Sequence, residues 1–139
     1  MKKNKVWNIL FFSFLFIGCQ IQDKPKSNGN NNELVKEQFD AFYTKFHNDS
    51  LFQISRIKFP LPGINTDEMT VEDTTYYWKK DLWVMQHMVD TTLFSKKMLI
   101  SDTAVEEEIT SKDPGVIIKR KFQRIRGKWH LVLYEDVNL

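Results

Sequence analysis

The C-terminal segment of the chain constrains the fold most, because two long runs of β-forming residues are separated there by a tight turn. The runs cover residues 116–125 and 128–134, and Arg126-Gly127 between them provides a glycine for a positive φ. Two such runs around a two-residue turn are typical of an antiparallel hairpin. The sequence therefore predicts a long hairpin, and with it a domain built on a sheet.

The register of this hairpin decides which side chains face the core. A two-residue turn places Phe122 opposite Leu131, and Arg124 opposite Trp129 within reach of a cation–π contact. Strict alternation then directs Trp129, Leu131 and Leu133 to the core. The other face would carry side chains of mixed polarity, namely His130, Val132 and Tyr134 together with Lys119 and Lys121. We interpret that face as either the lip of a binding surface or a sheet face partly covered by a helix.

Residues 33–47 carry apolar side chains at helical spacing. Val35, Phe39, Phe42 and Phe46 form the stripe of an amphipathic helix. The asparagines that precede Glu33 are suitable N-cap residues. We expect this helix to pack its aromatic stripe into the core rather than to line a ligand pocket.

The middle of the chain is less regular. Ser50-Leu51-Phe52-Gln53 matches a capping box and predicts a second, short helix, whereas Pro60-Leu61-Pro62-Gly63 predicts a turn. Residues 82–89 fit both a helix face and a strand, and we favour a short helix. The apolar residues between 93 and 100 are strand-like, and we interpret the run Glu106-Glu107-Glu108 as a solvated edge.

The first nineteen residues resemble a bacterial lipoprotein signal. Three lysines precede an apolar run over residues 6–17 that is short for a membrane span, and Gly18 precedes Cys19. The resemblance implies that residues 1–18 are removed and that Cys19 is acylated, so that lipid holds the protein at a membrane without crossing it. We expect a protein of the cell envelope that faces the periplasm or the cell exterior. The alternatives are an uncleaved signal anchor and an ordinary signal peptide with an unrelated thiol.

Cleavage changes how the composition is interpreted. Residues 19–32 are polar, contain Pro and Gly, and are expected to form a flexible tether. Residues 19–139 carry 17 Lys and Arg against 18 Asp and Glu, so the net charge is −1 instead of +2. This removes the argument for nucleic-acid binding, which needs a retained basic face. Cys19 is the only cysteine, which excludes an internal disulfide and a cysteine zinc site. Residues 33–139 suit a single domain with one core.

No catalytic or cofactor motif is present in the sequence. His47, His87 and His130 are 40 and 43 residues apart, so they form no local pair of metal ligands. We expect no cofactor, no metal site and no identifiable catalytic residue. The candidates for a pocket or surface site are Trp83, His87, His130 and Tyr134. An alternative that stays open is that the fold brings Asp40 or Asp81 to His87 or Tyr134 inside a cavity.

Several motifs together resemble one family. They are Asp49, the segment Phe52-Gln53-x-x-Arg56-Ile57-x-Phe59-Pro60-Leu61-x-Gly63, and the closing Gly127-Lys128-Trp129-x-Leu131. With the spaced tryptophans between them, they resemble the Bacteroides-type lipoproteins that contain domain of unknown function 4348. The resemblance implies an α+β fold similar to that of nuclear transport factor two, in which N-terminal helices pack on a curved antiparallel sheet as a cystatin-like cone ending in the long hairpin. It implies no catalytic residues.

We therefore expect a membrane-anchored, non-catalytic binding module for a small molecule or peptide, with an open cavity in the cone. The first alternative is an adaptor or structural lipoprotein that acts through a protein partner or as a homodimer, with a filled core and an exposed apolar patch. The second is an isomerase or dehydratase, which requires a carboxylate of raised pKa beside a donor. If Phe39, Phe42, Phe122 and Trp129 fill the cone, the outer sheet face becomes the expected site for a partner.

Overall fold

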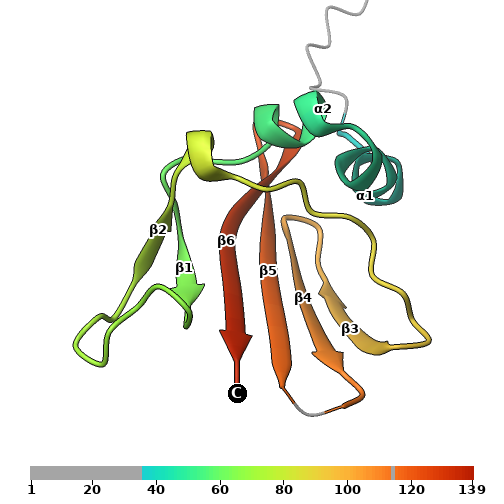
Figure 1. The fold of residues 1–139 in the computed structure, drawn as a ribbon. Helices are drawn as coiled ribbons and strands as arrows, with labels where there is room; N and C mark the ends of the chain where they lie inside the picture. Colours follow the sequence, from blue (N-terminus) through green and yellow to red (C-terminus); the bar gives the residue numbers. More distant parts are fainter. Residues whose placement is uncertain (1–35, 114) are drawn as a thin grey trace, which may run out of the picture. The chain divides into compact units, whose positions relative to one another are not determined.

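The computed structural model describes residues 36–113 and 115–139, in which helices pack on a six-stranded sheet (Figure 1). The predicted signal segment, Cys19, the tether and the predicted start of the first helix lie outside the described residues. The elements are α1 (Phe39–Asn48), α2 (Ser50–Ser55), β1 (Leu61–Asn65), β2 (Tyr76–Trp78), a 3-10 turn η1 (Lys80–Leu82), β3 (Phe94–Ile100), β4 (Ala104–Ser111), β5 (Val116–Ile125) and β6 (Lys128–Asn138). None of the helices in these residues is long and apolar enough to cross a bilayer.

The strands lie in the order β2-β1-β6-β5-β4-β3. All neighbouring strands are antiparallel except β1 and β6, which run parallel. The predicted fold class is confirmed, because short helices pack on one face of a curved sheet that does not close into a barrel. The parallel pair was not expected, and it brings the middle of the chain against the last strand.

The predicted hairpin is confirmed. Strands β5 and β6 are joined by Arg126 at φ 50° and Gly127 at φ 80°, the positive values that a tight hairpin turn requires. Phe122 lies opposite Leu131, and the Arg124 guanidinium lies 4.5 Å from the centre of the Trp129 ring system. The local sequence therefore determines the turn and the register next to it.

The predicted facing of the distal half of β6 is wrong, because the hairpin contains a β-bulge. Lys121 pairs with Leu133 and Phe122 pairs with Leu131, which leaves Val132 as an extra residue. One extra residue reverses the alternation of side chains beyond it. Tyr134 is consequently buried at 2% exposure on the helix side of the sheet, and Leu133 faces the other way.

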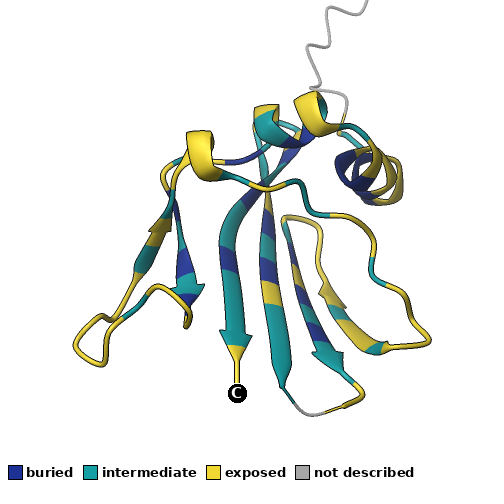
Figure 2. Cartoon of the chain, in the orientation of Figure 1, coloured by how far each residue is buried: buried dark blue, intermediate teal, exposed yellow. Residues whose placement is uncertain are grey.

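The apolar core lies between α1 and the strands β5 and β6. The Phe39 ring lies 5.1 Å from Trp129, and the Phe42 ring lies 5.7 Å from Phe122, both in edge-to-face arrangements. Phe46 is also buried, and the buried side of α1 faces the sheet (Figure 2). The aromatic stripe is thus a core feature, as expected. Its rings fill the space that an open cone would leave between α1 and the hairpin.

The helix boundaries differ from those predicted. Residues 36–38 are not helical, and α1 begins at Phe39 because Glu37 is bonded to the hairpin through its N–H, which donates to Gly127 O at 2.9 Å. The cap of α2 is Asp49 rather than Ser50, since the Asp49 carboxylate accepts from Phe52 N at 2.9 Å. Gln53 therefore has no capping role, and its side chain is buried instead.

Three predictions for the middle of the chain are also wrong. The Pro60 to Gly63 segment does not form a free turn, because residues from Leu61 pair with β6 and β2 as strand β1. Residues 83–90 form neither helix nor strand. The run Glu106-Glu107-Glu108 is not a sheet edge, because β4 pairs on both sides and Glu107 is buried.

Candidate functional site

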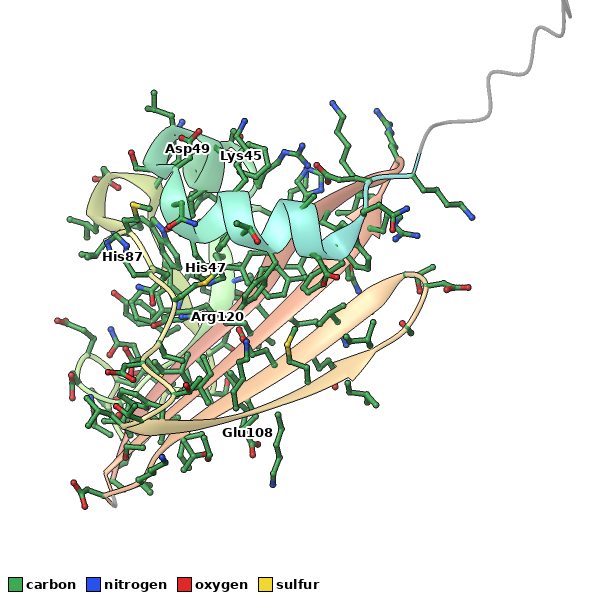
Figure 3. All side chains as sticks on the ribbon, turned by 90° about the vertical axis from the view of Figure 1, so that its right-hand side faces the viewer. Lys45, His47, Asp49, His87, Glu108 and Arg120 are labelled. Atoms are coloured by element: carbon green, nitrogen blue, oxygen red, sulfur yellow. The ribbon has the colours of Figure 1, made fainter. Side chains whose placement is uncertain are left out.

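A buried group of polar side chains lies beside the aromatic core. Strands β4, β5 and β6 bring Glu107, Arg120 and Tyr134 into one row of direct cross-strand neighbours. Helix α1 covers this row with polar side chains one turn apart, and His47 and Arg120 lie between α1 and the sheet in Figure 3. We call the group the interior polar cluster: Tyr43, His47, Gln86, Glu107, Arg120, Tyr134 and Asp136.

An ion pair between Arg120 and Glu107 forms the centre of the cluster. Arg120 Nη1 lies 3.1 Å from Glu107 Oε2, and the two side chains are 1% and 0% exposed. The Tyr43 hydroxyl donates to the other carboxylate oxygen, and Lys96 Nζ lies 4.0 Å from it. Burying two charges is costly, and these added donors satisfy the carboxylate that burial would otherwise leave poorly solvated.

His47 is held as a neutral imidazole. Its Nδ1 lies 2.9 Å from Tyr43 O, and its Nε2 lies 3.3 Å from Arg120 Nη1. Because a guanidinium only donates, Nε2 must be the acceptor and Nδ1 carries the proton. Burial, followed by the charge of Arg120, lowers the pKa of His47 to about 4. The ring therefore orients Arg120 and is not a base poised near neutral pH.

Residues 83–90, which we call the strap, run beside the cluster and contact it through Gln86. Figure 1 shows this segment passing between η1 and β3 without regular structure. The strap is held by Gln53, whose Nε2 donates to Gln86 O at 2.8 Å and whose Oε1 accepts from Gln86 N at 2.8 Å. Trp83 Nε1 also donates to Gln53 Oε1, at 2.9 Å. One buried amide side chain thus replaces the strand partner that the strap lacks.

The strap directs the Gln86 side chain into the cluster. Its Oε1 accepts from Tyr134 Oη at 3.0 Å and from Arg120 Nη2 at 3.3 Å. The Tyr134 hydroxyl also lies 3.4 Å from an oxygen of Asp136. Arg120 Nε has no hydrogen-bond partner among the described residues, although it is buried. A buried donor without a partner is costly, and it marks a place where a ligand could supply an acceptor.

Burial also shifts the pKa of the groups at this end of the cluster. Burial, followed by the charge of Asp136, raises the pKa of Tyr134 well above its usual range, so its hydroxyl stays protonated. Burial also raises the pKa of Asp136, against the hydrogen bond from Tyr134. Trp78 and Trp83 pack on the Tyr134 ring at 4.9 and 5.3 Å. The site thus combines permanent hydrogen-bond donors with an aromatic wall.

The sequence candidates are only partly brought together. Trp83 and Tyr134 meet at the cluster, whereas His87 lies on the exposed side of the strap. His130 lies elsewhere, in a hollow of about 580 Å³ beside the hairpin turn that Lys58 and Lys128 also line. Asp40 and Asp81, the two alternative acids, are both exposed.

The central cluster residues were missed, although the sequence contains a signal for two of them. Glu107 alternates with Val105 and Ile109, and Arg120 falls in phase with Phe122, which is the pattern of a charged residue on an apolar strand face. His47 follows Tyr43 by one helical turn on the flank of the aromatic stripe. Nothing in the sequence distinguishes Gln86, because it lies in a segment whose apolar residues show no clear periodicity.

The opposite face of the sheet carries paired charges. Lys97, Glu108, Lys119 and Glu135 form one cross-strand row around a hollow of about 530 Å³. Lys119 Nζ lies 3.8 Å from Glu135, and in the next row Lys121 lies 2.8 Å from Glu106. Within residues 36–113 and 115–139, no group of three or more His, Cys, Asp or Glu side chains is placed to hold a metal ion.

Similar folds occur in solved structures from Bacteroides. An NTF2-like protein from Bacteroides fragilis has 20% identity and a TM-score of 0.55, covering 73% of this chain and 46% of that one. A cystatin-like protein from Bacteroides caccae has 22% identity and a TM-score of 0.51, covering 72% and 76%. A protein from Bacteroides uniformis has 22% identity and a TM-score of 0.50, covering 74% and 77%. This chain therefore spans less than half of the B. fragilis protein, and the likeness shows the fold alone.

The sequence comparisons point to one family. No curated protein matches the chain. The family described as domain of unknown function (DUF4348) matches residues 17–139, which includes all the elements of the cone and the whole interior polar cluster. The protein belongs to the DUF4348 family.

Proposed function

We propose that this protein is a non-catalytic binding module, tethered to a membrane of the cell envelope through lipid on Cys19, that binds a small molecule or a peptide end at the interior polar cluster. The observation that carries the proposal is Arg120, which is buried with an unpartnered Nε behind the strap. A ligand can reach Arg120 if the strap moves, without disturbing the sheet or α1.

The aromatic half of the cone is not available to a ligand. Phe39, Phe42, Phe122 and Trp129 are packed together there and are at most 9% exposed. Ligand sites generally combine an apolar wall with a few convergent polar groups. The cluster provides both, through Trp83 and Tyr134 on one side and Arg120 on the other.

The protonation of the cluster favours binding over acid–base catalysis. A general acid or base works best with a pKa near the operating pH. The pKa of His47 is lowered to about 4 and that of Tyr134 is raised, so both groups keep one protonation state at neutral pH. Asp136 has a raised pKa beside the Tyr134 hydroxyl, which is the one feature here that an isomerase would share. That pair meets the requirement of the enzyme alternative, which ranks below the binding module because His47 and Tyr134 each keep one protonation state at neutral pH.

A protein partner on the outer sheet face is the second candidate. The hollow of about 530 Å³ and the filled aromatic half of the cone favour it. Against it, the charges of that face pair with one another, so they offer little net charge to select a partner. The interior site ranks first for that reason.

A thermal-shift screen of the full-length protein tests the interior site. The compounds would be small carboxylic acids, amides, amines, sugars and dipeptides. A ligand that binds the folded state raises the midpoint of unfolding. We expect at least one class of compound to raise the midpoint, with the rise lost in Tyr134→Phe and kept in Lys119→Met on the outer face.

A rise that is kept in Tyr134→Phe and lost in Lys119→Met would indicate a site on the outer face instead. If no compound raises the midpoint, the proposed binding module is refuted.

The anchor is tested separately. Cells that carry Cys19→Ser are expected to release the protein into the soluble fraction, because the acylated thiol is missing. A variant that stays as tightly bound to membranes as the unmodified chain would refute the lipid anchor.

A further inference from the structure

The geometry points to a carboxylate as the ligand group of the interior polar cluster: it would bind across the Nε and Nη2 edge of Arg120 with the Tyr134 hydroxyl as a third donor, in the place that Gln86 now occupies. This inference rests on the proposed function and adds the chemical class of ligand. It also assigns Gln86 a role as the side chain that the ligand displaces.

The N–H donors at one end of the Arg120 guanidinium are bonded, whereas those on the Nε and Nη2 edge have few partners. Nη1 is bonded to Glu107 at 3.1 Å and faces His47 at 3.3 Å, so that end of the guanidinium is occupied. Nη2 reaches only the Gln86 oxygen, and Nε has no partner among the described residues. The Nε and Nη2 protons lie side by side on one edge of the guanidinium. That edge matches the two oxygens of a carboxylate.

Gln86 occupies this edge incompletely. A carboxamide has one oxygen and one NH₂ group, so it can accept from a single donor of the edge without placing its own donor against the other. Its Nε2 accordingly turns away and donates to Val84 O at 3.2 Å. The 3.3 Å bond to Nη2 is long for a charge-assisted hydrogen bond. A carboxylate would satisfy both donors and accept from Tyr134 as well.

The charges around the edge favour an anion. Arg120 and Lys96 are two cations that share one buried carboxylate, Glu107, which also accepts from Tyr43. His47 is neutral at pH 7, because its pKa is lowered to about 4. Asp136, beside Tyr134, is the acidic group that would oppose a bound anion, and burial raises its pKa. The body of the ligand would lie against Trp83 and the Tyr134 ring, which suits a small apolar or aromatic acid.

The part of the strap after Trp83 can move because few contacts hold it, whereas Trp83 stays packed on Trp78 and Tyr134. The hydrogen bonds of the movable part to the interior come from Gln53 and from the Gln86 side chain. Val84, His87 and Met88 are exposed and pack little surface against the domain. Movement of the strap would uncover Arg120 while its ion pair with Glu107 stays formed.

Two substitutions of one residue in the full-length protein test the inference. Gln86→Glu places a carboxylate of the chain itself on the Arg120 edge. We expect it to raise the unfolding midpoint at pH 7 by about 4 °C, the shift that one further charge-assisted hydrogen bond produces in a domain of this size. The gain should be fully present above about pH 5 and lost as the pH falls below about 4, because pairing with Arg120 lowers the pKa of the new carboxylate below its unfolded value of about 4.3. Gln86→Ala leaves the edge vacant and should lower the midpoint, and His87→Ala is the matched exposed control on the same strap.

Benzoate and benzamide are the probes, because they have the same shape and differ in charge at neutral pH. With Gln86→Ala, we expect benzoate to bind at least about tenfold more tightly than benzamide, measured by calorimetry or by the fluorescence of the neighbouring tryptophans. Binding should be lost in Gln86→Glu, where the site is already filled. The salt dependence of binding should follow that of an ion pair.

The results separate this inference from the proposed function. If Gln86→Glu gains no stability at pH 7, or if Gln86→Ala binds benzamide as tightly as benzoate, the carboxylate site is refuted. If a neutral ligand binds the unmodified chain but not Tyr134→Phe, the proposed binding module is still supported. If no compound binds the unmodified chain or its Gln86→Ala variant, the carboxylate site and the proposed binding module are both refuted.

Discussion

Acidification should destabilise this protein through one buried histidine. His47 lies 1% exposed in the interior polar cluster, between the Tyr43 carbonyl and the Arg120 guanidinium. A proton on Nε2 would face the Arg120 N–H group directly. Glu107 favours that proton, but burial and the charges of Arg120 and Lys96 oppose it, and the pKa falls to about 4.

The direction and size of the effect follow from this pKa. In the unfolded chain the pKa of the imidazole is about 6.5, so below that pH the unfolded state binds a proton that the folded state does not. The contribution of His47 is fully present above pH 6.5 and is lost as the pH falls toward 4. Each pH unit in this window costs about 1.4 kcal/mol, so the total loss is about 3 kcal/mol, a large fraction of the stability of a small domain.

The assay is urea unfolding followed by tryptophan fluorescence at several pH values between 7.5 and 4, for the unmodified protein and for His47→Gln. Glutamine keeps an acceptor for Arg120 and has no titrating ring. We expect the difference in unfolding free energy between the two proteins to shrink by about 3 kcal/mol over the window. Asp136 and His130 titrate in both proteins, so their contributions cancel in the difference. Equal pH slopes for the two proteins, or a slope that His87→Ala removes instead, would refute the reasoning.

Two further changes test the fold that positions the cluster. Gly63→Ala should cost about 3 kcal/mol or more in urea unfolding, because its Cβ would lie 1.6 Å from Tyr134 O and would force β1 away from β6. Gly115→Ala is the comparison for backbone strain alone, since nothing lies within 4 Å of its Cβ while its φ of 155° disfavours a side chain; a loss at Gly63 no larger than at Gly115 would contradict the close approach. Asp49→Ala should cost about 1 kcal/mol by removing the α2 cap, and an unchanged unfolding midpoint would show that the cap bond to Phe52 N does not form.

Local features of the fold were predictable where neighbouring residues determine them. The hairpin turn depends on Arg126-Gly127 and on the β-forming residues on either side, all within a few positions. The aromatic stripe of α1 depends on helical periodicity alone, and its burial against Phe122 and Trp129 follows from it. Both predictions are confirmed.

The site was harder to predict, because its members come from segments without a shared pattern. Glu107 and Arg120 could have been assigned to the core by strand alternation, had the acidic run not been interpreted as one solvated surface. Tyr134 was assigned to the wrong face, since a single bulged residue at Val132 leaves no mark in the composition of the strand. Gln53 matched a capping box and instead holds the strap.

The sequence by itself determined the elements whose hydrogen bonds and apolar contacts are local: the hairpin, the aromatic helix and the α+β class. Only the tertiary structure decided the parallel pairing of β1 with β6, the bulge, and the placement of Gln86 against Arg120. The parallel pairing joins residues 71 positions apart and the Gln86 contact joins residues 34 positions apart, and such contacts are chosen by packing, by close backbone approach and by the need to satisfy buried polar groups. The candidate site belongs to this second group, because every one of its bonds to the strap joins distant parts of the chain.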